Sequence, residues 1–350
     1  MVAKRNEGID LLRVICMFLV VLGHVLVFCS GQYQANLQVI NSGNLPFNLD
    51  NSLLVFLECV CYVAVNVYFL LSGFFKINFK KERFANLLLQ VVFWNTLSIL
   101  CSLLLIRGGV QEAVKCLVYP FYKYWFMLVY LTIYLLSPLL NRIIEKVNAS
   151  ALVSCCIVFF FIFCIYSYAI DVFGVGNGTS VLWGIYCYFV GSVISKIHTS
   201  RSKSIIICLG SLTFFVGISL MFLHIGNMKM LWRFMINDTN PFLLIFAISL
   251  IALFQNIKLN VVLKIVTRIS PYMLGVYLIH SSQFGNYLWF YNDLPQICST
   301  GVLPRMIGII LYAFLVFVIC TVVEYLRVRM LGNTFATLTK VFVRFIYPVC

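Results

Sequence analysis

The first apolar segment of the chain contains three ionisable residues capable of acid–base chemistry. Asp10 and Arg13 are three residues apart, and His24 follows eleven residues after Arg13. Eleven helical residues amount to three turns plus about 20°, so all three side chains share one helix face, and Arg13 and His24 are about 16 Å apart along it. An imidazole suits proton transfer near neutral pH, whereas Asp10 and Arg13 can also form a purely structural ion pair. His24, Arg13 and Asp10 are our candidate catalytic residues.

Glu58 is a fourth catalytic candidate. It lies five residues inside the outer end of the second apolar segment, and His24 lies five residues inside the outer end of the first. A carboxylate that fixes the tautomer of a histidine is a common activation device. We therefore predict a Glu58–His24 pair, with a bond from Glu58 to a tyrosine or backbone group of another helix as the alternative.

Positive charge is concentrated directly after the second apolar segment. Lys76, Lys80, Lys81 and Arg83 lie within eight residues, on the same predicted side of the membrane as Arg13. Cations hold phosphate groups through charge-assisted hydrogen bonds. We predict that these five residues bind the phosphates of a nucleotide-like cofactor, although a general excess of positive charge inside the cell is the simpler alternative.

Three other polar residues within apolar segments are candidates for substrate or oxyanion binding. Asn66 and Ser72, in the second segment, can donate hydrogen bonds to a developing oxyanion. His280 is predicted midway along the ninth segment and is followed by Ser281 and Ser282. Its alternative role is a hydrogen bond between helices.

The composition places all of these residues in a membrane protein. Of 350 residues, 62% are hydrophobic and only 10% are charged, and the mean hydropathy is +1.00. These values exclude a water-soluble monomer, since soluble domains carry roughly 25% charged residues. The apolar stretches do not alternate with polar residues as barrel strands do. The sequence predicts an all-α polytopic membrane helix bundle, with residues 1–350 forming one integral membrane domain.

The hydropathy pattern predicts about ten transmembrane helices. Their predicted ranges are 9–29, 53–75, 84–106, 122–140, 151–168, 179–196, 205–224, 240–256, 271–290 and 305–327.

The distribution of charge predicts the orientation of these helices. With the amino terminus in the cytoplasm, 19 of the 25 Lys and Arg residues lie inside. The six on the outside are Arg107, Lys115, Lys123, Lys229, Arg233 and Arg305. This bias follows the positive-inside rule, so both termini are predicted to be cytoplasmic. The same rule accounts for the net charge of +14 without a nucleic-acid partner.

The 14 cysteines do not predict a metal site. Most lie in apolar segments without histidine or carboxylate neighbours at metal-binding spacing, so they are interpreted as small packing residues. Cys29, Cys116 and Cys298 fall near the predicted outer face, where a disulfide between two of them is possible.

Four motifs, in order along the chain, resemble those of the bacterial membrane acyltransferase-3 family. The first is RNEGIDLLR at 5–13 with VLGH at 21–24, and the second is VNVYFLLSGF at 65–74. The third is WFM at 125–127 with YLLSP at 134–138, and the fourth is GVYLIH at 275–280. The resemblance covers essentially the whole chain.

This resemblance implies an O-acyltransferase of the bacterial inner (plasma) membrane. Such an enzyme moves an acyl group, usually acetyl, from cytoplasmic acyl-CoA to a hydroxyl of an extracytoplasmic glycan or lipid-linked sugar. Acyl-CoA is then a co-substrate, and no cofactor is bound permanently. The resemblance implies an essential role for Arg13 and His24, and it associates the basic loop after Phe74 with the donor. Members often carry an acidic residue just after the late histidine, where this chain has Ser281.

Two other functions are compatible with the residues alone. A transporter or flippase for lipid-linked sugars also needs a few charged groups within a bundle and a basic inner side. A membrane sensing module that shares only the fold is a third possibility.

Overall fold

The computed structural model describes residues 6–29, 48–106, 110–119, 121, 123–167, 170–171, 173–197, 199–291 and 302–346. Throughout these ranges the regular elements are helices, and none is a strand. The predicted all-α helix bundle is therefore confirmed. The predicted outer loop from Ser30 lies outside the described residues as far as position 47.

The helices match the predicted spans with two differences of extent. Their bounds in the first half are α1 (Glu7–Cys29), α3 (Leu49–Phe74), α4 (Lys81–Leu105), α5 (Val110–Val118), α6 (Trp125–Lys146) and α7 (Ala149–Phe160, continued by a π-helix over Phe161–Tyr166). Those in the second half are α9 (Val181–Ile194), α10 (Arg201–His224), α11 (Met228–Met235), α12 (Pro241–Phe254), α13 (Val261–Thr267), α14 (Met273–His280), α15 (Gln283–Asn286) and α16 (Val302–Ile346). Eight described segments are long and apolar enough to span a membrane, and α9 and α12 are shorter apolar helices.

The ninth span is shifted from its predicted range of 271–290. The apolar segment runs from Val261 to His280, so His280 lies at the end of α14 and not midway along a helix. The helix breaks because Ser282 takes an extended conformation and its side chain accepts a hydrogen bond from the backbone NH of Gly285, which starts α15. A hydropathy profile does not reveal a helix cap of this kind inside an apolar segment.

The last helix is longer than its predicted span of 305–327. Helix α16 continues to Ile346, and the first proline after position 327 is Pro348. The charges of Arg327 and Arg329 limit membrane depth, but charge does not stop a helix.

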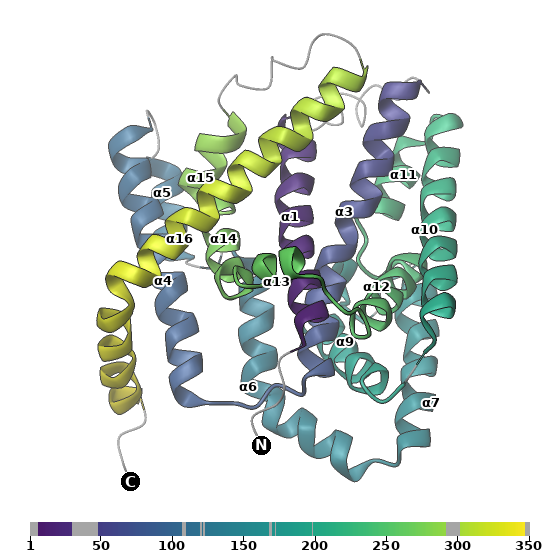
Figure 1. The fold of residues 1–350 in the computed structure, drawn as a ribbon, viewed down its shortest axis with the longest axis horizontal. Coiled ribbons are helices and arrows are strands. Elements are labelled where there is room, and N and C mark those ends of the chain that lie inside the picture. The colour runs from purple at the N-terminus through teal and green to yellow at the C-terminus, as the bar shows by residue number, and fades with distance from the viewer. Residues whose placement is uncertain are drawn as a thin grey trace.

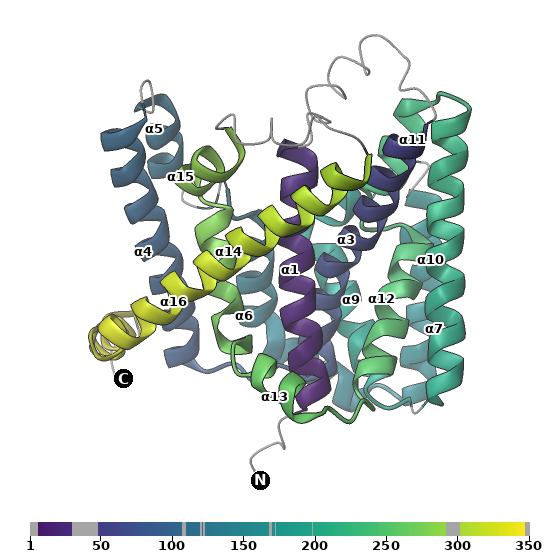
Figure 2. The same cartoon turned by 45° about the horizontal axis from the view of Figure 1, so that its top comes forward.

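Helix α1 occupies the middle of the bundle, and the other helices are arranged on both sides of it (Figure 1). Helices α4 and α5 lie at one edge and α7 and α10 at the other, and α16 crosses in front of α1 at a steep angle (Figures 1 and 2). Helix α1 begins and α16 ends toward the lower side of Figure 1. We call the side where α1 begins the inner face and the side where it ends the outer face.

Exposed apolar side chains cover the outside of this bundle. Leu104 is 81% exposed, Ile206 is 69% exposed and Leu311 is 61% exposed. Helix α7 buries only Leu152, and α10 buries a row of serines that bond back to its own carbonyls. A bundle with apolar residues outside and small polar residues between helices is suited to lipid and not to water.

Two glycines allow α3 and α9 to pack with their backbones in contact. A Cβ atom at Gly73 would collide with the carbonyl oxygen of Tyr188, and one at Gly191 would collide with that of Leu70. Close approach of helices through small residues is typical of membrane bundles. The contact fixes the inner end of α3, where the basic loop begins.

The orientation of the bundle can be tested on α10. We expect a cysteine introduced at Lys229, just after the outer end of α10, to react with a membrane-impermeant maleimide in intact cells. A cysteine at Arg201, at the inner end, should react only after permeabilisation, because the positive-inside rule places it in the cytoplasm. Variants lacking the reactive native cysteines provide the background. The reverse labelling pattern would invert the predicted orientation.

Candidate active site

Two histidines from distant parts of the chain meet in the bundle. The rings of His24 in α1 and His280 at the end of α14 have centroids 5.1 Å apart and are tilted by 49°. His280 is fully buried, whereas His24 is partly exposed. Both were candidates from the sequence, but their contact was not predicted because nothing in the sequence fixes how α14 packs on α1.

His280 is held on both ring nitrogens. Its Nδ1 lies 2.6 Å from the carbonyl oxygen of Val276, one turn earlier in α14. Its Nε2 lies 3.2 Å from the hydroxyl oxygen of Ser281. The ring orientation is thus fixed by the backbone on one side and by a hydroxyl on the other.

No hydrogen bond or ion pair joins Glu58 and His24 among the described residues. Glu58 is 2% exposed, and its Oε1 has no hydrogen-bond partner among the described residues. Its neighbour Cys59 instead faces α10, where its thiol lies 3.5 Å from the hydroxyl of Ser219. The two residues were predicted at similar depths, but the rotation of α3 about its axis decides which side chains meet α1, and the sequence does not give this rotation.

Asp10 and Arg13 form an ion pair at the inner face. The distance from Arg13 Nη1 to Asp10 Oδ1 is 2.8 Å. The hydroxyl of Ser270 also donates to Asp10 Oδ1 at 3.4 Å, and the Arg13 guanidinium lies over the Phe75 ring at 4.9 Å. Asp10 and Arg13 therefore form the ion pair that was considered above as their structural role. Arg13 keeps a third of its side chain exposed, which leaves it accessible to a ligand.

The basic loop after α3 is held in place by α6. Lys76 has a left-handed backbone (φ +46°), which turns the chain out of α3. The Tyr134 hydroxyl accepts a hydrogen bond from the Lys80 backbone NH at 3.1 Å, and the Asn141 amide donates to the Ile77 carbonyl at 3.0 Å. The loop is thus ordered by α6, through Tyr134 of the YLLSP segment and Asn141 just beyond it.

The cations of this loop and of the first turn of α4 are open to solvent. Lys80, Lys81 and Arg83 are exposed and Lys76 is partly exposed. Among the described residues, no carboxylate forms an ion pair with Lys76, Lys80 or Arg83. The structure places them on the same face as Arg13, as predicted for a phosphate site.

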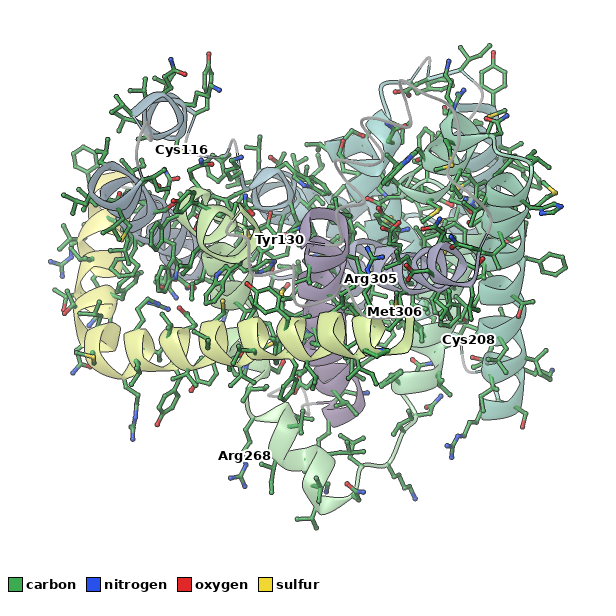
Figure 3. The ribbon with its side chains drawn as sticks, turned by 90° about the horizontal axis from the view of Figure 1, so that it is seen from above. Cys116, Tyr130, Cys208, Arg268, Arg305 and Met306 are labelled. Carbon is green, nitrogen blue, oxygen red and sulfur yellow. The ribbon has the colours of Figure 1, made fainter. Side chains whose placement is uncertain are left out.

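A row of aromatic side chains, which we call the aromatic series, connects the histidines with the basic loop. Its members in order are His24, His280, Tyr277, Phe126, Tyr130, Tyr134 and the Arg83 guanidinium. Successive ring centroids are 5.1 to 6.4 Å apart, and the guanidinium carbon is 5.9 Å from the Tyr134 ring. Figure 3 shows Tyr130 near the centre of the bundle, close to α1. The aromatic series therefore has the candidate catalytic histidines at one end and a candidate phosphate-binding cation at the other.

Asn66 and Ser72, the oxyanion candidates, both form hydrogen bonds within the bundle. The Asn66 amide donates to the Asp238 carbonyl at 2.8 Å and accepts from the Trp183 indole at 2.9 Å. Ser72 bonds back to the Tyr68 carbonyl at 3.1 Å. Gly23, beside His24, packs on Cys61, and Ser72 is eleven residues further along α3, about 16 Å toward the inner face. Both side chains are explained by their structural contacts.

Comparison with known protein families gives a match along most of the chain. Residues 6–325 match the acyltransferase-3 family, described as an acyltransferase domain. The chain belongs to the acyltransferase-3 family. The protein is thus a membrane acyltransferase, and the resemblance found in its four motifs is confirmed at this level. Neither the curated proteins nor the solved structures give a significant match.

The acyltransferase contains a buried ion pair that our reading of the sequence did not single out. In α16, Arg327 donates two hydrogen bonds to the carboxylate of Glu324, at 2.8 and 2.6 Å. The Trp94 indole of α4 also donates to Glu324, at 3.2 Å, and Gly275 of α14 leaves room for this carboxylate. The spacing of Glu324 and Arg327 by three residues on an apolar helix was the available signal. The pair fixes α16 against the helices that carry the aromatic series.

Of the three cysteines near the predicted outer face, Cys116 is the one whose side chain the structure describes. Cys116 is buried in α5, where its carbonyl accepts a hydrogen bond from Asn95. The side chain of Cys29 and the whole of Cys298 lie outside the described residues. A disulfide among them stays a prediction.

Asp238 gives the acyltransferase a testable pH dependence. This residue lies between α11 and α12, and burial raises the pKa of its carboxyl from 3.8 to about 8. The native state therefore binds more protons than the unfolded state between these values, and this contribution to stability decreases as the pH rises from about 4 to 8. We expect Asp238→Asn to remove the decrease and to raise the melting temperature at pH 8 more than at pH 5.

Thermal unfolding in detergent at both pH values measures this effect. The control is Glu145→Gln, which changes an exposed carboxylate. Equal stability changes at both pH values in Asp238→Asn would contradict the prediction.

Proposed function

We propose that this membrane acyltransferase moves an acyl group from cytoplasmic acyl-CoA to a hydroxyl of an extracytoplasmic glycan or lipid-linked sugar. The observation that carries the proposal is the aromatic series. It connects a cluster of exposed cations at the inner face with a histidine pair deeper in the bundle. A donor with several phosphates and a long, weakly polar arm is complementary to such an arrangement.

At the inner face, the cations provide the binding site for CoA. Lys80 is exposed on the loop that α6 holds, and Lys81 and Arg83 are exposed in the first turn of α4, where they can bind phosphates. Arg13 adds a partly exposed guanidinium. The pantetheine arm of the donor then follows the aromatic rings toward His24 and His280.

At the other end, His24 acts as the general base. Its ring is partly exposed and stands eleven residues beyond Arg13 on the same helix. It removes the proton from the acceptor hydroxyl as this oxygen attacks the acyl carbon. We take acetyl as the acyl group and the bacterial inner membrane as the location, on the family resemblance.

One experiment separates this function from sugar transport. Purified protein in proteoliposomes is incubated with labelled acetyl-CoA and a panel of oligosaccharides that end in hexose or N-acetylhexosamine. The proposal requires CoA release together with a labelled sugar ester. Movement of sugar without any consumption of the thioester would support a transporter and contradict the proposal.

The donor site makes a quantitative prediction. We expect the double variant Lys80→Gln, Arg83→Gln to bind acetyl-CoA about tenfold or more weakly at low salt, because the two charge-assisted contacts to phosphate together should contribute at least ~1.4 kcal/mol. The difference should shrink as salt screens the charges. Calorimetric titration at two salt concentrations measures both effects.

The matched control is Arg201→Gln, Lys203→Gln. It removes two exposed cations from the inner end of α10, outside the basic loop. Unchanged affinity in the first double variant, or an equal loss in the control, would contradict a CoA site at the basic loop. Its cations would then reflect only the positive-inside rule.

A further inference from the structure

Ser281 is a buried hydroxyl whose position has no role in the mechanism above. It follows His280 at the point where α14 ends, and its oxygen is 3.2 Å from His280 Nε2. It is 5% exposed, and His280 is 0% exposed. A hydroxyl at this distance from an imidazole nitrogen has the geometry of a nucleophile and its base.

The direction of these hydrogen bonds follows from chemistry. A carbonyl oxygen only accepts, so the contact of 2.6 Å from His280 Nδ1 to the Val276 carbonyl requires the proton on Nδ1. In the neutral ring Nε2 then carries a lone pair, and the Ser281 hydroxyl donates to it. The backbone carbonyl takes the orienting role that a carboxylate takes in a catalytic triad.

A second base stands beside the first. The His24 ring is 5.1 Å from the His280 ring, centroid to centroid, and His24 is the more exposed of the two. One histidine is therefore paired with a nucleophile of the protein, and the second, which is the more exposed of the two, lies beside it.

We propose that Ser281 is a nucleophile that carries the acyl group as a serine ester between acyl-CoA and the acceptor, with His280 and His24 serving the two half-reactions. This inference rests on the proposed function.

In the first half-reaction, Ser281 Oγ attacks the carbonyl carbon of the thioester. Its proton moves to His280 Nε2, the carbon–sulfur bond breaks, and CoA leaves as a thiolate, which a thiol pKa near 8.5 allows. The products are an ester on Ser281, a protonated His280 and free CoA. No oxidant or other reactant is needed.

In the second half-reaction, the acceptor hydroxyl attacks the carbonyl carbon of this ester. His24 takes the hydroxyl proton, the bond from the carbon to Ser281 Oγ breaks, and His280 returns its proton to that oxygen. The products are the acylated acceptor, the original Ser281 and a protonated His24, which loses its proton to solvent. Burial of Ser281 and His280 protects the ester from water between the two steps.

The test uses the whole protein in detergent with labelled acetyl-CoA and no acceptor. We expect release of about one equivalent of CoA per chain and a gain of one acetyl group on the peptide containing Ser281, measured by mass spectrometry. His24→Ala should still form this ester and accumulate it, because only the second half-reaction needs His24. His280→Ala should not form it.

Two substitutions make the assignment specific to one oxygen. Ser281→Ala should abolish acetylation of the peptide and reduce transfer at least 100-fold, whereas Ser249→Ala should retain both within a few-fold, since its buried hydroxyl bonds back to the Phe246 carbonyl within α12. Ser281→Cys differs by a single atom and should carry the label as a thioester that hydroxylamine removes.

The outcomes distinguish this inference from the proposed function. If the wild type acetylates oligosaccharides while its own chain stays unlabelled and Ser281→Ala remains active, transfer is direct and the serine ester is excluded. A label on any other residue excludes it as well. If the wild type consumes no acetyl-CoA with or without oligosaccharides, the proposed function itself fails.

Discussion

His24→Ala is expected to reach the membrane and fold normally while losing overall acyl transfer by at least ~10²-fold, the contribution typical of a positioned acid–base group. The partly exposed ring contributes little to packing, and α1 is held by apolar side chains such as Val21 and Val25. The measurement is the rate of labelled sugar ester formation per mole of monodisperse protein. His24→Gln should behave similarly, since an amide hydrogen-bonds but does not act as a base.

The control for this loss is His224→Ala. His224 lies at the outer end of α10 and belongs to no part of the aromatic series. Its substitution should leave transfer unchanged. A well-folded His24→Ala protein that transfers acetyl to sugar at the wild-type rate would remove His24 from the mechanism and leave the donor site intact.

Arg327→Met is expected to lower the free energy of unfolding by about 3–5 kcal/mol, because it leaves the Glu324 carboxylate buried without its charge partner. Glu324 is 2% exposed and Arg327 is 8% exposed, so water cannot readily replace the lost hydrogen bonds. Chemical unfolding in mixed micelles measures the loss.

The double variant Glu324→Gln, Arg327→Met separates the ion pair from packing. Glutamine keeps an oxygen for the Trp94 indole, and no buried charge remains. We expect this variant to recover most of the lost stability, because removing both charges of a buried pair costs far less than removing one. A double variant as unstable as Arg327→Met would show that the shape of the side chains, and not their charge, holds α16 in place.

Several site residues were predictable from a single segment. Helix periodicity shows which side chains share a face, and the cost of placing an ionisable residue in a membrane marks it as a candidate. Asp10, Arg13 and His24 share a face of α1 by arithmetic alone, and the ion pair of the first two is present. The basic loop was evident from its density of charge. Its ordering by Tyr134 and Asn141 was not, because these contacts join segments more than fifty residues apart.

The remaining features depend on how helices rotate and break. Glu58 was matched to His24 by depth, but its Oε1 has no hydrogen-bond partner among the described residues, and His24 contacts the His280 ring. His280 was predicted inside a helix, and the break that Ser282 introduces after it brings Ser281 onto its ring. Glu324 was not singled out from the sequence, because the mean hydropathy of α16 stays high although one turn of the helix is charged.

The contrast between α7 and α9 has a consequence for how such a chain diverges over time. Helix α9 buries nine of its fourteen residues, including the glycine that touches α3, whereas α7 buries only Leu152 among its twelve. Any apolar side chain satisfies a position that faces lipid, so α7 is free to drift in sequence. Helix α9 carries no candidate catalytic residue, yet it sets the position of the basic loop through α3. Strong purifying selection on α9 would therefore reflect packing and would be misleading as a guide to the chemistry.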